Sequence, residues 1–175
     1  PMTESDLEQV LYWRNHPSIR SHMYTQNEIS LDEHRVWWDW AKGARRSRYL
    51  IYELDGQSMG YVAFSEIVPE AGTANWGFYT APDVAKGTGS LMALAAMDMA
   101  FGPLGLRKLS AEAIGRNAAS IGLHESFGFQ REGLFRAHVV IGGALVDVVR
   151  LALFADAWAR LRPAKLQTLI ERLSQ

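Results

Sequence analysis

The start of the chain has the hydrophobic spacing of a surface helix. Apolar residues recur every three or four positions from Leu7 to Leu11, which places them on one helix face. Thr3 and Asp6 form a capping pattern just ahead of this run, and Pro17 follows it. The pattern therefore predicts a first helix that begins near Thr3 and stops before Pro17.

A second helix is predicted after an irregular segment. Ser30 and Glu33 have the spacing of a capping box and open a helical run toward Gly43. Residues 18–29 show neither a helical nor a strand period and are predicted to be irregular. At the other end of the chain, one or two helices are expected around Pro163.

The remaining elements alternate between strand and helix patterns. Two strand-like runs flank Asp55 and Gly56, a dipeptide that favours a tight hairpin, and two more flank Gly142 and Gly143. The predicted strands cover 49–54, 58–68, 73–80, 108–114, 135–141 and 144–154, with helices at 90–101 and 117–127. Because hairpins dominate and only two crossovers are helical, we expect one α+β domain over residues 1–175, with a mixed, mostly antiparallel sheet flanked by helices.

Composition narrows the functional classes. With 175 residues, 48% of them hydrophobic, the chain can form one domain with an ordinary core. The net charge of −1 gives no overall basic surface, so no nucleic-acid partner is expected. No cysteine is present, which excludes disulfides, thiolate metal sites and a cysteine nucleophile. No apolar run is long enough to span a membrane, so we expect a cytoplasmic protein without a metal or a membrane contact.

The stretch VAKGTGSL, residues 84–91, places two glycines at a predicted helix start. It does not fit a dinucleotide fingerprint, because Met92 stands at the third glycine position, and Lys86 is misplaced for a Walker loop. Small residues at a helix N-terminus still let backbone N–H groups approach an anion closely. The loop is therefore either a cradle for a pyrophosphate or a simple turn with a helix cap.

A second motif decides between these alternatives. The stretch RNAASIGLHESFGF, residues 116–129, follows a predicted strand and spaces polar and aromatic side chains along one side of a short helix. It resembles the acetyl-CoA-binding motif N-x-x-S-x-x-L-(Y)-x-x-x-G-F of the GNAT superfamily of N-acetyltransferases. The glycine loop resembles the other motif of that superfamily, [Q/R]-x-x-G-x-[G/A]. Two motifs in this order imply the GNAT acyl-CoA N-acyltransferase fold, with acetyl-CoA as the co-substrate.

The resemblance also implies a cofactor site. Backbone N–H groups of a splayed strand would polarise the thioester carbonyl, the glycine loop would hold the pyrophosphate, and the second motif would border the pantetheine and adenosine arm. The implied cofactor-binding residues are Phe78, Tyr79, Thr80, Val84, Ala85, Lys86, Gly87, Thr88, Gly89, Ser90, Asn117, Ser120, His124 and Phe127.

This sequence departs from the family pattern at two positions. Val84 stands where Gln or Arg is usual, which removes one side-chain contact to phosphate. His124 stands where many members have a tyrosine that protonates the leaving thiolate. The family also has a strand ahead of the first helix, and Pro1 and Met2 would be no more than its end.

Acetyl transfer to an amine needs a base, a polarised carbonyl and a proton donor. Glu112 is the expected base, because its neighbours along the strand are apolar and would raise its pKa; the alternative is a salt bridge near a sheet edge. His124 is a candidate acid, or else a packed histidine on the helix face. Tyr79 and Tyr61 are alternative acids.

The acceptor is suggested by a finer resemblance. Residues 13–38, 74–82 and 132–151 resemble the N-acetyltransferases that act on UDP-4-amino-4,6-dideoxy-N-acetyl-altrosamine in pseudaminic acid biosynthesis, which supplies the sugar that decorates flagellin. Less closely, they resemble ribosomal-protein N-terminal acetyltransferases. A non-catalytic acetyl-CoA-binding module is a third alternative, and the sequence leaves a homodimer open. A UDP-sugar needs cations and flat surfaces, for which the candidates are Arg14, Arg20, His22, Met23, Tyr24 and His138.

Overall fold

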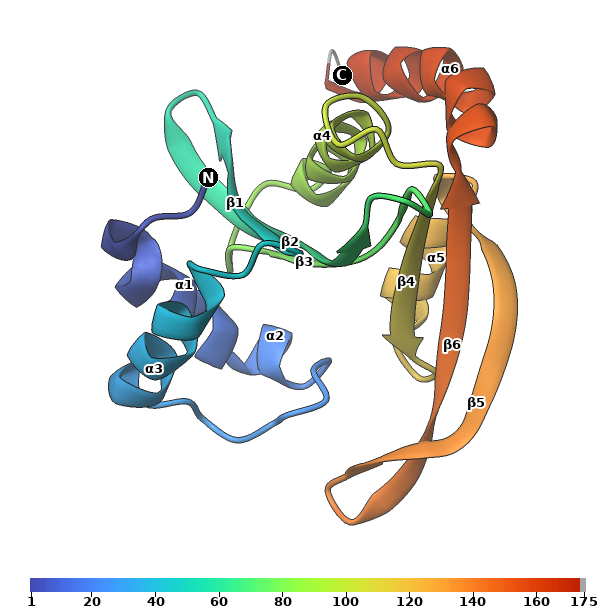
Figure 1. Cartoon of the computed structure of the whole chain (residues 1–175). Helices are drawn as coiled ribbons and strands as arrows, with labels where there is room; N and C mark the ends of the chain where they lie inside the picture. Colours follow the sequence, from blue (N-terminus) through green and yellow to red (C-terminus); the bar gives the residue numbers. More distant parts are fainter. Residues whose placement is uncertain (174–175) are drawn as a thin grey trace.

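A computed structural model describes residues 1–173, and its centre is a six-stranded sheet (Figure 1). The strand order is β1-β2-β3-β4-β6-β5, with only β3 and β4 parallel, so the mixed, mostly antiparallel sheet expected from the sequence is confirmed. The strands are β1 (Arg48–Leu54), β2 (Gln57–Val68), β3 (Thr73–Thr80), β4 (Lys108–Ile114), β5 (Gln130–Ile141) and β6 (Ala144–Phe154).

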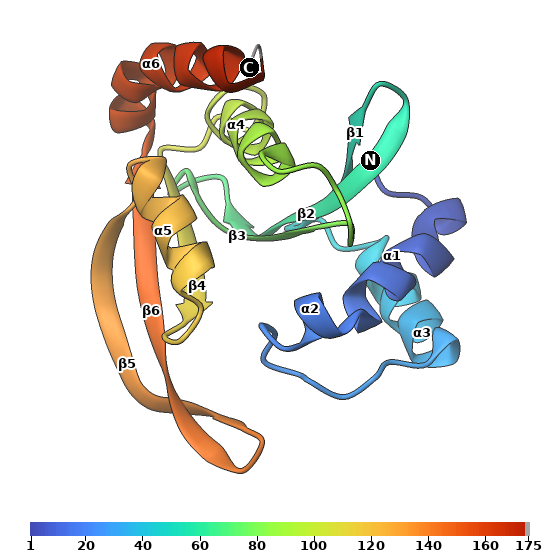
Figure 2. The same ribbon diagram turned by 180° about the vertical axis from the view of Figure 1, so that it is seen from behind.

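Helices cover the two faces of this sheet unequally. The amino-terminal helices pack on the β1–β3 part of one face, while α4 and α5 pack on the other face (Figures 1 and 2). That leaves the β4–β6–β5 part of the first face without a covering helix. The helices are η1 (Glu4–Asp6), α1 (Leu7–Asn15), α2 (Pro17–Arg20), α3 (Leu31–Ala41), α4 (Thr88–Phe101), α5 (Ala118–Ser126) and α6 (Ala155–Leu173).

Strand alternation explains why there are two hydrophobic clusters. Trp76 and Tyr79 lie on the same strand but on opposite faces, because successive side chains point to opposite sides. Trp76 belongs to the larger cluster, with Phe64, Met97 and Leu151, under α4 and α5. Tyr79 packs against the smaller cluster, which α1 and α3 bury. Packing against the two clusters, one on each face, holds the sheet in place between them.

The sheet opens between β3 and β4. These strands pair over only three positions, from Thr73 opposite Lys108 to Asn75 opposite Ser110. Beyond that point β3 continues to Thr80 and β4 to Ile114 without pairing with each other. The parallel strands therefore diverge into a wedge in the middle of the sheet.

Two prolines lie within helical segments. Pro17 does not only end the first helix; it occupies the first turn of α2, where its missing N–H costs no hydrogen bond, and the His16 side chain caps that turn. Pro163 lies inside one continuous helix, α6. Just ahead of it, Arg162 donates to both carboxylate oxygens of Asp98 on α4, at 2.7 and 2.8 Å. This anchor holds α6 against α4.

The remaining differences lie at element ends. The chain ahead of η1 contacts the sheet through the Met2 N–H, which donates to the Tyr49 carbonyl at 2.9 Å. α4 begins at Thr88, two residues earlier than predicted, and β5 begins at Gln130. Within residues 1–173, no helix is both long enough and apolar enough to cross a membrane.

Candidate active site

The glycine loop lies beside the end of β3. Gly87 caps α4 with φ 103°, a left-handed conformation that favours glycine. The buried Thr88 hydroxyl donates to the Ala85 carbonyl at 2.7 Å and folds the loop onto the helix start. A Cβ on Gly89 would meet only the Thr80 methyl, at 3.7 Å. The loop is therefore close to the β3 arm of the wedge and free of bulky side chains.

The second motif borders the β4 arm of the wedge. The Asn117 side chain caps α5 by accepting a hydrogen bond from the Ser120 N–H at 3.0 Å. Both residues line a hollow of about 430 Å³ that also includes Trp76 and Glu112. Each arm of the wedge thus lies beside one of the two motifs found in the sequence.

His124 lies behind this hollow rather than in it. Its side chain is only 3% exposed and contacts the rings of Trp76, Phe78 and Phe129. Nδ1 lies 2.7 Å from the Ser120 carbonyl, which assigns the ring proton to Nδ1, while Nε2 is buried without a partner among the described residues. Burial lowers the pKa of His124, and the bond to Ser120 opposes this only in part. A neutral imidazole of this kind favours the packed alternative over the acid.

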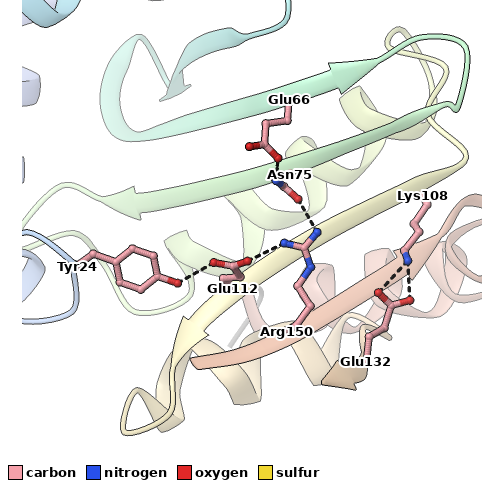
Figure 3. Close-up of polar contacts among 7 residues, drawn as sticks. All are labelled: Tyr24, Glu66, Asn75, Lys108, Glu112, Glu132 and Arg150. Atoms are coloured by element: carbon pink, nitrogen blue, oxygen red, sulfur yellow. Dashed lines mark hydrogen bonds and ion pairs between the residues drawn. The ribbon is translucent and has the colours of Figure 1, made fainter. Parts of the chain in front are cut away.

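A chain of polar side chains crosses the floor of the hollow (Figure 3). Glu112 accepts from the Tyr24 hydroxyl at 2.8 Å with one oxygen and from Arg150 at 2.8 Å with the other. Arg150 also donates to the Asn75 side chain at 2.9 Å, and Asn75 donates to Glu66. The chain joins the 21–30 segment to four strands at the point where β3 and β4 separate.

This network corrects one expectation about Glu112. The carboxylate faces the cleft as predicted, but its neighbours are an arginine and a phenol, not apolar groups. The salt bridge, named as the alternative, is also present. Sequence spacing did not predict Arg150 as a partner of Glu112, because the two residues are far apart along the chain. The β4–β6 register places them directly opposite each other.

A second pocket, of about 400 Å³, lies under α1 and α3 on the same face of the sheet. Arg14, Met23 and Tyr79 line it, and Met23 also lines the hollow around Glu112. Tyr79 stacks on Tyr61 at 4.9 Å between ring centres. Burial raises the pKa of Tyr79, with the Arg14 charge acting weakly against it, so the phenol stays protonated.

A third hollow, of about 690 Å³, extends the cleft along the uncovered part of the face. Trp40 presents an exposed ring there, beside Arg45 and Arg46. Asn75 and Arg150 line both this hollow and the one around Glu112. The two hollows therefore adjoin and share a floor.

Three predicted site residues lie elsewhere. Phe127 is buried in the core and stacks on Trp158 of α6, so it cannot contact a cofactor in this conformation. Arg20 faces Glu28 at 3.8 Å and lines none of the three hollows described above. His138 is exposed on β5 beside the Phe135 ring. Their side-chain directions depend on helix rotation and strand bulges that sequence spacing did not reveal.

Comparison with known proteins defines the class. The family profile described as "Acetyltransferase (GNAT) domain" matches residues 1–130, and the chain belongs to that family. It transfers an acetyl group from acetyl-CoA to an amine. Within residues 1–173, no three His, Asp or Glu side chains gather to hold a metal.

Individual proteins that resemble the chain share about a quarter of its residues or less. Spermidine N(1)-acetyltransferase of Escherichia coli (strain K12) is 24% identical over 176 residues, covering 100% of this chain and 95% of the relative. Acetyltransferase PseH of Campylobacter jejuni is 25% identical over 124 residues, covering 71% of this chain and 76% of the relative. The solved spermidine N-acetyltransferase from Vibrio cholerae, in complex with CoA and spermine, has the same fold, with a TM-score of 0.83 and 22% identity over 90% of this chain and 95% of that chain.

Proposed function

We propose that the chain acetylates the 4-amino group of a UDP-linked amino-deoxy sugar, as in pseudaminic acid biosynthesis. The observation that carries this is the charge of the cleft. Its three hollows are lined by four arginines and three glutamates, Arg14, Arg45, Arg46, Arg150, Glu33, Glu66 and Glu112. Cationic walls suit an acceptor that brings a diphosphate.

The three carboxylates already have partners. Glu112 pairs with Arg150, Glu66 accepts from Asn75, and Glu33 caps α3 through Ser30. A polyamine brings several ammonium groups, each of which needs an acceptor when it leaves water. The arginines of the three hollows also outnumber the glutamates by one, so the cleft is better suited to an anionic acceptor than to a polycation.

The wider hollow provides a place for the nucleotide. Arg45 and Arg46 lie on one wall, where a diphosphate would meet two guanidinium groups. The exposed Trp40 ring offers a flat surface of the kind on which a uracil ring stacks. Because this hollow adjoins the one around Glu112, a sugar attached to the diphosphate would extend toward the base.

On the cofactor side, acetyl-CoA would occupy the wedge between β3 and β4. The loop 84–90 would hold its pyrophosphate through backbone N–H groups, and the backbone of 78–80 would bind the carbonyl and pantetheine. Asn117 and Ser120 would border the pantetheine from the other arm. The absence of bulky side chains around Gly87 and Gly89 supports this placement.

Glu112 would act as the base of the reaction. Its ion pair with Arg150 fixes the carboxylate near the vertex of the wedge, in position to take the proton of an attacking amine. Arg150 would act as a positioning residue, because it contacts Glu112 and Asn75 on the two separating strands.

A polyamine is the second candidate acceptor, and the relatives favour it. The E. coli protein matched over its near-full length is named for spermidine, and the V. cholerae structure contains spermine. Both candidate acceptors would be acetylated by the same chemistry. They differ only in which cleft residues bind the part of the acceptor away from the reacting amine.

The test is a direct comparison of acceptors. Free thiol released from acetyl-CoA is measured with a UDP-4-amino-4,6-dideoxy sugar, with spermidine and with a basic ribosomal-tail peptide. We expect turnover with the sugar nucleotide alone. Turnover with spermidine and none with the sugar would reject the proposal and assign the polyamine.

Arginine variants sharpen this comparison. Arg46→Ala should raise KM for the sugar nucleotide by about tenfold, the effect of losing one charged hydrogen bond, while leaving KM for acetyl-CoA unchanged. Arg35→Ala is the matched control, because Arg35 also lies on the surface near the tryptophans but faces only Asp32. Equal effects of the two variants would mean that Arg46 does not contact the acceptor.

A further inference from the structure

The site lacks an acid where the family usually has one. His124 occupies that helix position, but its ring is sealed among aromatic side chains and its only ring proton is committed to Ser120. Tyr79 and Tyr61, the other candidates, line the pocket under α1 and α3, which is separate from the hollow around Glu112. The proton that the leaving thiolate needs must therefore come from another group.

One phenol does reach the hollow that the second motif borders. Tyr24 lies on the segment between α2 and α3, and its side chain points at Glu112 from across the cleft (Figure 3). It lines the same hollow as Asn117 and Ser120 of the second motif. Its hydroxyl donates to Glu112 at 2.8 Å, so an acid and a base are in direct contact near the vertex of the wedge.

We propose that Tyr24 is the general acid of the acetyl transfer and that Glu112 reloads it with the proton taken from the amine. The amine nitrogen forms the new bond to the thioester carbon, and the carbon–sulfur bond breaks with its electron pair left on sulfur. Glu112 takes the surplus proton from nitrogen, Tyr24 gives its hydroxyl proton to sulfur, and Glu112 passes its proton to the Tyr24 oxygen. The products are an amide and a thiol, with both side chains as they began.

The energetics of this relay are favourable. Burial, with the hydrogen bond and charge of Glu112, raises the pKa of Tyr24, while Arg150 acts weakly in the opposite sense. The phenol therefore carries its proton at neutral pH. A carboxylic acid is a stronger acid than a thiol by about four pH units, so the net movement of the proton to sulfur is downhill. Because Glu112 reloads the phenol at contact distance, no free phenolate has to accumulate.

This inference rests on the proposed placement of the thioester in the wedge and on Glu112 as the base, but not on the identity of the acceptor. It is tested with whichever amine the wild type acetylates, sugar nucleotide or polyamine. Failure of the sugar nucleotide as a substrate therefore leaves the test of Tyr24 intact.

The first variant is Tyr24→Phe, which keeps the ring and removes the proton donor. We expect kcat to fall about 100-fold, the lower range for loss of an acid, with KM for the amine and affinity for CoA unchanged. Tyr12→Phe is the matched control, because Tyr12 is 64% exposed on α1 and lines none of the hollows around Glu112. Affinity for CoA and the thermal midpoint show whether each variant is folded.

The second variant replaces Tyr24 by a fluorinated tyrosine, whose phenol is a stronger acid. Activity should return, and the loss of kcat at alkaline pH should move to lower pH than in the wild type. The titratable and charged groups that line the hollow with Tyr24 are Glu112, Arg150, Glu66 and His22, and they are the same in both proteins. The inference is overturned if Tyr24→Phe keeps its kcat, if it loses activity through KM alone, or if fluorination leaves the alkaline limb in place. A full kcat in Glu112→Gln would overturn the reloading step.

Discussion

Arg150 joins Glu112 on β4 to Asn75 on β3, with contacts of 2.8 and 2.9 Å, at the point where the two strands separate. Asn75 is the last residue of β3 that pairs with β4, and Glu112 lies two residues beyond its partner Ser110. One guanidinium therefore spans the vertex of the wedge. The side chain proposed as the base is held by the same group that bridges the opening.

This arrangement predicts the effect of removing the carboxylate charge. Glu112→Gln should lower kcat by about 100- to 1,000-fold, because an amide cannot take a proton from the amine. KM for acetyl-CoA should stay unchanged, since the cofactor contacts lie on other residues. Steady-state kinetics with both substrates varied measures the two effects separately.

The neighbouring ion pair supplies the control for that variant. Lys108 and Glu132 lie on the same sheet, at 2.7 Å from each other, but outside the Glu112 hollow (Figure 3). Glu132→Gln removes an equivalent charge and should leave kcat unaltered. A similar loss in both variants would point to the stability of the sheet rather than to the chemistry of Glu112.

The glycine loop predicts a selective loss of cofactor binding. Gly89→Trp places an indole beside the Thr80 methyl, in the space at the helix start that the pyrophosphate would occupy. CoA binding, measured by calorimetry, should disappear while the thermal midpoint stays near that of the wild type. Gly89→Ala is the control, because its Cβ makes only an ordinary contact at 3.7 Å. Micromolar affinity in a folded Gly89→Trp variant would refute the cofactor loop.

The lowered pKa of buried His124 predicts how the stability of the protein depends on pH. Its pKa is lowered from 6.5 by burial, so in the native protein it takes up a proton only at lower pH than in the unfolded chain. As pH falls below about 6.5, the unfolded state gains the proton first, and the free energy of unfolding decreases. The stabilisation is complete above that pH and declines until the native histidine also protonates.

The measurement is denaturant unfolding at several pH values between about 7 and about 5. His124→Phe should flatten the decline, because the aromatic packing is kept and the titration is removed. His34, whose pKa burial also lowers, should account for part of the remaining slope. An unchanged slope in His124→Phe would show that His124 titrates alike in both states.

Much of the fold and half of the site were accessible from the sequence because they depend on short-range spacing. The capping box of Ser30 and Glu33 is a pattern of three-residue spacing, and it is present. The contacts of Glu112 are of another kind: they join residues 38 and 88 positions apart, to Arg150 and Tyr24. Their partners follow from strand register and from the path of an irregular segment, which local periodicity does not specify.

The buried residues of the second motif show the same limit. Spacing placed Ser120, His124 and Phe127 along one side of the predicted helix, but the three side chains lie in different surroundings. Ser120 reaches the hollow, His124 is sealed behind it, and Phe127 packs against α6. Periodicity shows which residues share a face, whereas the packing of α5 between sheet and α6 decides how far that face is open.

The end of the second motif predicts a pair of opposite stability effects. Gly128 has φ +90°, and a Cβ there would lie 2.3 Å from the end of Leu161 on α6. Gly128→Ala should therefore lower the free energy of unfolding by about 1–3 kcal/mol, through backbone strain and displacement of Leu161. Gly122, inside α5, has nothing within 4 Å of the position of a Cβ, so Gly122→Ala should raise that free energy by about 0.5–1 kcal/mol. Denaturant unfolding of both variants decides: a loss in both would mean that α5 tolerates no added methyl, and no change in Gly128→Ala would mean that the helix end can adopt another conformation.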